Sequence, residues 1–379
     1  MIYLDAGATT LEKPASVHRA VEEAVRTMSS PGRGSYPASR LAEETAFSCR
    51  MEAAELFGVS SPERVVFTEN ATHGLNIAIK SLVKPGNRVV ISGYEHNAVT
   101  RPLCAMPQVE RVIVDTPLFR PEQAVEEFRQ AIEQGADVVI CNQVSNVFGY
   151  RQPVEKIAAM CQKAGVPLIV DASQSAGVVP LNLEQLGAAF IAMPGHKGLY
   201  GPQGTGLLLC GCDQIRPLME GGTGSVSRQQ AMPEELPDRL EAGTHNMPGI
   251  AGLLEGIRFV RSVGVEEIAR HERSMVRHAA QKLQELPGVK LWLAEREKDQ
   301  TGVLSFVVEG RDCQELGELL AQRGIAVRAG LHCAPLAHRT VGTLETGTVR
   351  LSPSAFNTRA QIDQFAAELS DILRENIRF

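Results

Sequence analysis

Short apolar runs alternate with amphipathic stretches between Pro62 and Cys210. Stretches such as 72–84, 121–135 and 153–165 have helical spacing and end in Gly or Lys. This alternation predicts an α/β fold with a mostly parallel sheet and helices on both faces, in which ligands gather at the carboxyl ends of the strands. Seven runs rich in Val, Ile and Leu have the pattern of buried strands: 64–68, 88–92, 111–115, 137–142, 166–171, 188–193 and 204–210.

The pattern changes after residues 241–249. We expect a large domain over 14–248 and a smaller α+β domain over 249–379, with residues 1–13 crossing over to the small domain. In that second part, a long helical stretch over about 250–285 precedes expected strands at 288–293, 302–310, 325–330 and 348–352 and helices near 312–323 and 358–375.

Composition and charge narrow the possible partners. The 379 residues include 44 acids and 38 bases, a net charge of −6, and no basic run. Nucleic acid and anionic membranes are therefore poor candidates. The first residues, "MIYLDAGATTLEKP", carry early acids, and no apolar window approaches the ~18 residues of a membrane span. We expect a cytoplasmic protein with no membrane contact.

The eight cysteines should be reduced in that compartment. Cys210 and Cys212 form a close pair, but no second pair follows, so we expect no metal site. Cys104, Cys141 and Cys161 lie within or beside apolar runs, which is typical of core positions. Cys333 differs, because it lies in "RAGLHCAPLAH", a segment with two histidines and no helical or strand periodicity.

Polar residues follow several of the expected strands. Asp171 ends "VPLIVD", and Gln174 comes three residues later. A carboxylate at the mouth of an apolar strand needs a cationic partner, although Asp171 could equally be a helix N-cap. Lys197 lies in the Gly- and Pro-rich segment "MPGHKGLYGPQGTG" and could be a Schiff-base lysine rather than a surface charge. An aspartate for a pyridinium nitrogen and a lysine for an imine are what pyridoxal phosphate requires.

Two further segments fit that cofactor. "TENATHGLN" opens a helix, so its backbone N–H groups and Thr72 could bind a phosphate, although Thr72 could also be only an N-cap. "YEHNAV" places His96 after another strand, where an imidazole could stack on the pyridine ring or have a purely structural role.

Together these segments resemble a known family over nearly the whole chain. The chain resembles fold-type I pyridoxal-phosphate enzymes of the class V aminotransferase group, and most of all cysteine desulfurases of the branch that includes the SufS-type enzymes and selenocysteine lyases. The matching motifs are "YLDAGATT", "TENATHG", "EHNA", "QVSNVFG", "VDASQSAG", "GHKGLYGPQGTG", "EAGTHN", "RAGLHCA" and "TVRLSPSAFNT".

The resemblance implies roles for residues around the cofactor, pyridoxal 5'-phosphate. Lys197 would bind the cofactor covalently and move the substrate's Cα proton. Asp171 would keep the pyridinium nitrogen protonated, and Gln174 would bind the ring's phenolic oxygen. His96 would stack on the ring as a catalytic residue. The other expected contacts are Thr72, Ala71 and His196 at the phosphate, Asn146 at the ring oxygen, and Thr244 from the second subunit of a homodimer.

The resemblance also implies the substrate and the reaction. Arg350 would bind the carboxylate of L-cysteine, with Asn146 and Ala6 beside the substrate. Cys333 would attack the substrate's sulfur, keep it as a persulfide and release L-alanine. Such a thiolate must reach both substrate and acceptor, which a mobile loop permits. His332 and His338 could promote its deprotonation or be merely solvated.

Two departures and a short loop refine this expectation. Pro194 stands where relatives commonly carry a phosphate-binding serine, so the phosphate contacts must be redistributed. The stretch 221–237 is shorter than in well-known members of the branch. Only 17 residues separate Cys333 from Arg350 along the chain, which favours a restricted cysteine and a sulfur-acceptor protein.

Other functions remain open at this stage. Selenocysteine lyase shares the fold and cofactor, and another class V aminotransferase or lyase would not need Cys333. A non-catalytic sulfur carrier would need neither Lys197 nor Arg350. The sequence does not identify the destination of the sulfur. The alternatives are iron–sulfur cluster assembly, tRNA modification, another cofactor and selenium supply.

Overall fold

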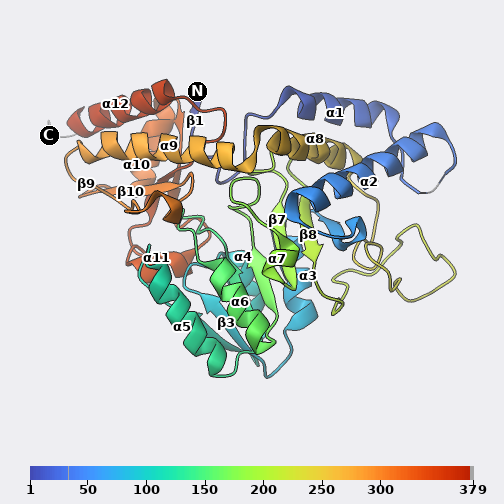
Figure 1. Cartoon of the computed structure of the whole chain (residues 1–379). Helices are drawn as coiled ribbons and strands as arrows, with labels where there is room; N and C mark the ends of the chain where they lie inside the picture. The colour runs from blue at the N-terminus through green and yellow to red at the C-terminus, as the bar shows by residue number, and fades with distance from the viewer. Residues whose placement is uncertain (33, 376–379) are drawn as a thin grey trace.

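The computed structural model describes residues 1–32 and 34–375 and contains the expected large sheet (Figure 1). Its seven strands have the order β2-β8-β7-β6-β5-β3-β4, and only β8 runs antiparallel to its neighbours. The mostly parallel seven-stranded α/β fold is therefore confirmed. The strands are β2 (Val65–Thr68), β3 (Arg88–Ser92), β4 (Glu110–Val114), β5 (Val138–Asn142), β6 (Leu168–Asp171), β7 (Phe190–Pro194) and β8 (Gly206–Cys210).

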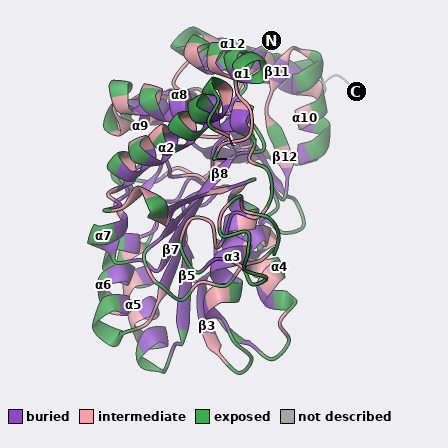
Figure 2. Cartoon of the chain, turned by 90° about the vertical axis from the view of Figure 1, so that its right-hand side faces the viewer, coloured by how far each residue is buried: buried purple, intermediate pink, exposed green. Residues whose placement is uncertain are grey.

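Helices cover both faces of this sheet. Successive strand residues point to opposite faces, so Val139 belongs to the core cluster that includes residues of α2, α5, α6, α7 and α8, while Ile140 belongs to the cluster that includes residues of α3 and α4. Figure 2 shows the strands buried between helices with exposed outer sides. The helices of the first 200 residues are α1 (Ala15–Thr27), α2 (Pro37–Phe57), α3 (Ala71–Leu82), α4 (Asn97–Cys104), α5 (Pro121–Glu133), α6 (Val154–Ala164) and α7 (Leu183–Leu186), with a 3-10 turn at Pro62–Arg64.

A second, four-stranded sheet forms in the last part of the chain, with the antiparallel order β12-β13-β10-β9. A separate two-stranded sheet pairs β1 (Ile2–Tyr3) in parallel with β11 (Ile325–Ala326), so the N-terminal residues lie against the C-terminal part. The remaining elements are β9 (Val289–Leu291), β10 (Leu304–Val308), α10 (Cys313–Gln322), β12 (Arg328–Gly330), α11 (Pro335–Val341), β13 (Thr348–Leu351) and α12 (Arg359–Glu375), with a 3-10 turn at Glu297–Asp299.

The helical stretch over about 250–285 is two helices, not one. Gly264 separates α8 (Met247–Val263) from α9 (Val265–Gln284), and its φ of 94° lies in a region that favours glycine. The two helices run end to end across the top of the molecule in Figure 1. α8 packs against α1 and α2, whereas α9 packs against α12 and β9. The division of the chain after residue 248 stays a prediction.

The structure corrects one of the cysteine assignments. Cys141 and Cys161 are buried as predicted, but Cys104 is exposed, because it is the last residue of α4 and the chain turns there toward solvent. Cys210 ends β8 and is buried. In the described part of the chain, no helix is long and apolar enough to cross a membrane. Within the same residues, no group of three or more His, Cys, Asp or Glu is arranged to hold a metal ion.

Candidate active site

A cavity of about 210 Å³ lies at the carboxyl edge of the large sheet, where the small domain meets it. The carboxyl ends of the parallel strands lie side by side at this edge, so residues that follow different strands come together there. Ten predicted site residues line this cavity: Ala71, Thr72, His96, Asn146, Asp171, Gln174, His196, Lys197, Cys333 and Arg350.

Asp171 occupies the floor of the cavity at the end of β6. Its side chain is buried, and its Oδ1 accepts a hydrogen bond from the Ser173 backbone nitrogen at 2.9 Å and another from the Ser173 hydroxyl. No helix begins at Asp171, because turns follow β6 directly, so the N-cap alternative is wrong. These bonds hold a carboxylate at the point where β6 opens into the cavity.

Lys197 follows β7 and contributes an amine to the same cavity. Burial, followed by the positive charge of Arg350, lowers the pKa of Lys197 to about 8. About a tenth of the amine is therefore unprotonated at pH 7, far more than for an ordinary lysine. An unprotonated amine can act as a nucleophile or a base.

His96 and His196 are neutral imidazoles near the cavity. Burial lowers the pKa of His96 to about 4, and burial followed by the charge of Lys197 lowers that of His196 to about 4. His96 caps α4, since its Nδ1 accepts a hydrogen bond from the Ala98 backbone nitrogen at 3.0 Å. This bond fixes the ring orientation, so the structural role considered for His96 is present whether or not it also stacks on a ligand.

The N-terminus of α3 opens onto the cavity beside Thr72. Asn70 is the N-cap of this helix, because its Oδ1 accepts from the His73 backbone nitrogen at 2.9 Å. The interpretation of Thr72 as the N-cap is therefore wrong, and its hydroxyl is not used for capping. A helix N-terminus with a hydroxyl beside it suits a phosphate group.

Arg350 lies in the middle of β13 and is 2% exposed. Its Nη2 lies 2.6 Å from Asp5 Oδ1, and its Nη1 donates to the Asn146 carbonyl at 2.9 Å. A side chain at Gly7 would place its Cβ 3.2 Å from the guanidinium carbon, so glycine leaves that group room. Arg350 therefore does not form a surface ion pair. Its guanidinium is buried, and these contacts fix its orientation.

Cys333 lies between β12 and α11 with an exposed side chain. His332 and Cys333 have φ values of 50° and 55°, a left-handed turn that directs the chain sharply around the thiol. The Asn97 backbone nitrogen donates to the Cys333 carbonyl at 2.8 Å, and Asn146 Nδ2 donates to the His332 carbonyl at 2.7 Å. These two bonds anchor the loop backbone to the start of α4 and to Asn146, while the mobility of the loop stays a prediction.

The two histidines near Cys333 are buried rather than solvated. His332 Nε2 lies 3.1 Å from the Thr348 carbonyl, and His338 Nδ1 lies 2.7 Å from the Thr343 hydroxyl. Burial lowers the pKa of His332 to about 2 and that of His338 to about 4. Both rings are neutral near pH 7 and supply no positive charge to stabilise a thiolate.

Arg328 is a site residue that the sequence analysis missed. It lines the cavity and pairs with Arg350 in the register of β12 and β13. A second cation in this cavity adds to the attraction for a carboxylate or phosphate. Its position at the start of "RAGLHCA", close to the cysteine, was a usable signal.

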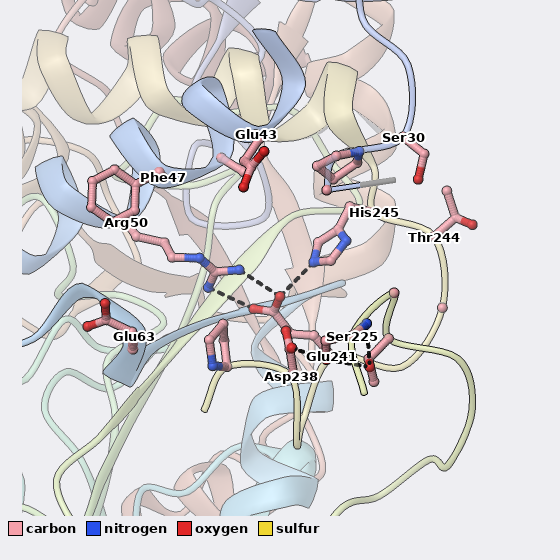
Figure 3. Close-up of a pocket in the computed structure, with 17 residues that line it drawn as sticks. Ser30, Glu43, Phe47, Arg50, Glu63, Ser225, Asp238, Glu241, Thr244 and His245 are labelled. Carbon is pink, nitrogen blue, oxygen red and sulfur yellow. Dashed lines mark hydrogen bonds and ion pairs between the residues drawn. The ribbon is translucent and has the colours of Figure 1, made fainter. Parts of the chain in front are cut away.

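Two predicted residues lie outside this cavity. Ala6 lines a small neighbouring cavity. Thr244 lines a cavity of about 400 Å³ beside the edge strand β2 of the large sheet (Figure 3). There Glu241 binds both Arg50 and His245, at 2.6 Å to each, and so holds the ends of the short segment that carries Thr244.

The cavity fits pyridoxal 5'-phosphate. Four buried polar atoms of residues that line it have no hydrogen-bond partner among the described residues: Asn146 Oδ1, His196 Nδ1, His332 Nδ1 and Arg350 Nε. Buried polar atoms of this kind are nearly always paired in folded proteins, so they indicate a polar ligand. Pro194 also lines the cavity and offers no hydroxyl, which leaves the phosphate to the α3 N-terminus and its neighbours.

Comparisons with known proteins agree with this arrangement. The aminotransferase class-V family matches residues 2–365. A probable cysteine desulfurase of Methanothermobacter thermautotrophicus is 31% identical over 98% of this chain and 94% of its own length. A probable cysteine desulfurase of Mycolicibacterium paratuberculosis is 32% identical over 96% of this chain, but the chain spans only 54% of that protein.

Solved structures of cysteine desulfurases are also similar to this chain. The apo structure of a cysteine desulfurase from Thermococcus onnurineus NA1 has a TM-score of 0.91 and 30% identity, covering 99% of this chain and 95% of that one. The Escherichia coli cysteine desulfurase CsdA has a TM-score of 0.87 and 26% identity, covering 98% and 94%. The chain therefore belongs to the aminotransferase class-V family, whose cysteine desulfurases it resembles over nearly its whole length.

Proposed function

We propose that this protein is a pyridoxal-phosphate-dependent cysteine desulfurase that releases L-alanine from L-cysteine and keeps the sulfur on Cys333. One observation carries the proposal. An exposed thiol, a lysine amine of lowered pKa and a buried guanidinium line a single cavity of about 210 Å³. An aminotransferase has no need of the thiol, whereas a desulfurase needs all three groups.

Each residue has a task in binding the cofactor and substrate. The Lys197 amine would hold the cofactor covalently, Asp171 would face its ring nitrogen, and Thr72 with the α3 N-terminus would bind its phosphate. When bound, the cofactor supplies an electron sink for the substrate's Cα. Arg350 would bind the substrate carboxylate through its guanidinium, whose orientation Asp5 fixes.

The chemical steps then fall to two side chains. The Lys197 amine takes the proton from the substrate's Cα and returns a proton later in the cycle. The Cys333 thiolate attacks the substrate's sulfur, so that an S–S bond forms as the C–S bond breaks and its electron pair leaves with the carbon fragment. Protonation of that fragment gives alanine. The exposure of Cys333 would leave its persulfide accessible to an acceptor.

The first experiment measures alanine released from L-cysteine with a reductant present, in wild type and Cys333→Ala, while the cofactor's visible absorbance is followed. We expect wild type to release alanine, and the variant to bind the cofactor without turnover. Full activity of the variant would overturn the role of Cys333. If neither protein releases alanine but both bind the cofactor, the substrate assignment is wrong.

We also propose a homodimer as the active form. The α2 region carries four exposed apolar side chains, Tyr36, Leu41, Phe47 and Met51, and Phe47 lines the cavity that contains Thr244. Such a surface is typical of a protein interface. Thr244 would then serve the partner's cofactor. Sedimentation analysis tests this proposal, and a monomer at working concentration would contradict it.

A sulfur-acceptor protein is the partner that we propose for the persulfide. The loop backbone is anchored on both sides of the thiol, so Cys333 cannot travel far to deliver sulfur. An acceptor that docks over the loop would remove this limit. Turnover with and without a candidate acceptor tests the idea, and no stimulation by any acceptor would count against it.

A further inference from the structure

A buried acid, Glu95, lies directly before His96 in the turn that follows β3. The Glu95 side chain is 0% exposed. Its Oε1 accepts a hydrogen bond from the Ser92 hydroxyl and another from the Asn142 backbone nitrogen, the latter at 2.8 Å. No ion pair formed by the described residues includes Glu95. A buried carboxyl without a cationic partner is costly, so its presence beside the active site needs an explanation.

The two oxygens of this carboxyl group have different surroundings. Oε1 accepts both hydrogen bonds, whereas Oε2 is buried and has no partner among the described residues. A carboxylate anion accepts hydrogen bonds at both oxygens, while a carboxylic acid accepts at its carbonyl oxygen and carries a proton on the other. The contacts of Glu95 therefore fit a neutral acid with its proton on Oε2.

The groups around Glu95 favour the same neutral state. Burial raises the pKa of Glu95 to about 8, and the negative charge of Asp171 acts in the same direction, although the hydrogen bonds from Ser92 and Asn142 act to lower it. The Cys141 thiol of β5 shares these surroundings, and burial raises its pKa as well, so it remains neutral. Glu95 is therefore mostly protonated at pH 7.

Hydrogen bonds join the turn after β3 to the end of β5. Asn142 is the last residue of β5, and its Nδ2 donates to the Tyr94 carbonyl at 2.6 Å. Gln152 Nε2 donates to the Ser92 hydroxyl and to the Asn142 carbonyl, at 3.0 Å each. Glu95 bonds directly to the ends of both strands, through Ser92 on β3 and Asn142 on β5. The acid therefore determines where the turn lies relative to β5.

The end of β5 lies beside the aspartate of the proposed cofactor site. Asn142 is the register partner of Asp171 across β5 and β6, and both residues line the cavity of about 210 Å³. An ionised Glu95 would add a second negative charge near Asp171, which is unfavourable and would change the charge that faces the ring nitrogen of the cofactor. A neutral acid accepts the same hydrogen bonds without that effect.

The residues that follow Glu95 reach the other side of the cavity. His96 lines the cavity, and the Asn97 backbone nitrogen donates to the Cys333 carbonyl at 2.8 Å. A shift of the turn would therefore move the His96 ring and the anchor of the Cys333 loop together. Glu95 itself is not among the described residues that line the cavity, so it can act on the site only through its neighbours.

We propose that Glu95 is a positioning residue of the active site, a neutral carboxylic acid that holds the turn carrying His96 and Asn97 on the end of β5. It accepts the hydrogen bonds of Ser92 and Asn142 without placing a second negative charge beside Asp171. No covalent bond changes and no proton is transferred in this role. The proposal rests on the proposed function, because it assigns Glu95 to the same active site.

The main test compares wild type, Glu95→Ala and Glu95→Gln as holoenzymes. Alanine removes both hydrogen bonds, so we expect kcat for alanine release to fall on the order of 10–100-fold, with KM changed less. Glutamine keeps an accepting oxygen and the neutral charge, so Glu95→Gln should restore most of the lost activity. Glu318→Ala, at an exposed position of α10, is the control and should behave as wild type.

Two kinetic outcomes would overturn the proposal. Equal losses in Glu95→Gln and Glu95→Ala would mean that the site uses the charge or the proton of Glu95 and not a neutral acceptor. Wild-type kcat and visible absorbance of the bound cofactor in Glu95→Ala, together with unfolding at lower urea, would mean a purely structural role. If Glu95→Ala does not fold, Glu95→Asp replaces it, because the shorter side chain keeps the acid but loses its reach to Asn142.

Infrared spectroscopy of the protein without cofactor gives a readout that does not depend on turnover. The difference between wild type and Glu95→Gln at pH 6 should contain the C=O band of a protonated carboxyl group, and the difference between wild type and Glu318→Gln should lack it. Absence of the band from the first difference would overturn the neutral state of Glu95. If wild type fails to release alanine, the proposed function is wrong, while this band still decides whether Glu95 is a neutral acid.

Discussion

Asp171 and Lys197 lie at the ends of strands in the large sheet, whereas Cys333 lies in a loop of the small domain. Asp171 is buried and fixed by Ser173, and Lys197 is partly buried with a lowered pKa. The Cys333 thiol is exposed, although its backbone is hydrogen-bonded to the large domain. The strand ends thus hold their polar groups in a buried, fixed environment, while the loop leaves the Cys333 sulfur exposed; under the proposed function, that sulfur meets substrate and acceptor.

This difference has a physical cause. Burial and fixed neighbouring charges shift the pKa of an ionisable group, and the strand ends of a packed sheet provide both. A group that must hand its product to another molecule needs contact with solvent. The neutral histidines beside Cys333 belong to the packing of the loop and not to its charge.

Lys197→Ala should have the largest effect, because Lys197 is the only lysine among the described residues that line the cavity. We expect alanine release to fall on the order of 10⁴-fold or more, and the covalent form of the bound cofactor to be lost from the visible spectrum. Lys163→Ala, at an exposed position of α6, is the control. Residual turnover within tenfold of wild type would show that the floor does not carry the proton chemistry.

Cys333→Ala should abolish the reaction of the loop without affecting cofactor binding at the strand ends. The loop variant should bind cofactor as wild type does but lose alanine release on the order of 10³-fold, because the attacking sulfur is gone. Cys104→Ala removes the other fully exposed cysteine and should keep full activity. Loss of cofactor affinity in Cys333→Ala would show that the loop also binds the cofactor and that the two regions do not have separate roles.

Arg350→Lys tests whether the geometry of the Arg350 guanidinium matters beyond its charge. Lysine keeps the positive charge but cannot reproduce the planar fork that contacts Asp5 and the Asn146 carbonyl. We expect a cost of about 2 kcal/mol, equal to a rise of roughly 30-fold in KM for L-cysteine. Steady-state kinetics measure this change, with Arg374→Lys on the exposed side of α12 as control. An unchanged KM would remove Arg350 from substrate binding.

The smallest expected effect is on the pH dependence of the free energy of unfolding, through the buried His338 beside the loop. The pKa of His338 is depressed to about 4, so below pH 6.5 the unfolded chain binds a proton that the folded chain excludes. Stability therefore falls as pH drops from 7 to 5. His338→Gln should reduce that fall by about 1–2 kcal/mol in urea melts, whereas His18→Gln should not. An equal fall in all three proteins would mean that His338 is accessible to protons in the folded state.

The strand pattern and the motif order were readable from the sequence because they depend on local composition. Runs of Val, Ile and Leu identified all seven strands of the large sheet, and the residues after them identified most of the cavity. The break at Gly264 was missed, since a glycine inside a helical pattern can be tolerated. The exposure of Cys104 was missed because an apolar neighbourhood along the chain does not fix which side of a helix end faces solvent.

The sequence by itself determined the fold class, which depends on the local pattern of apolar and polar residues. Through its motifs it also predicted the cofactor-binding segments and Cys333 as the nucleophile. Only the tertiary structure placed Asp5 and Asn146 on Arg350, anchored the Cys333 loop through Asn97, and brought Arg328 to the cavity. These contacts connect residues far apart in the chain, and their burial sets the pKa values, so no local pattern could reveal them.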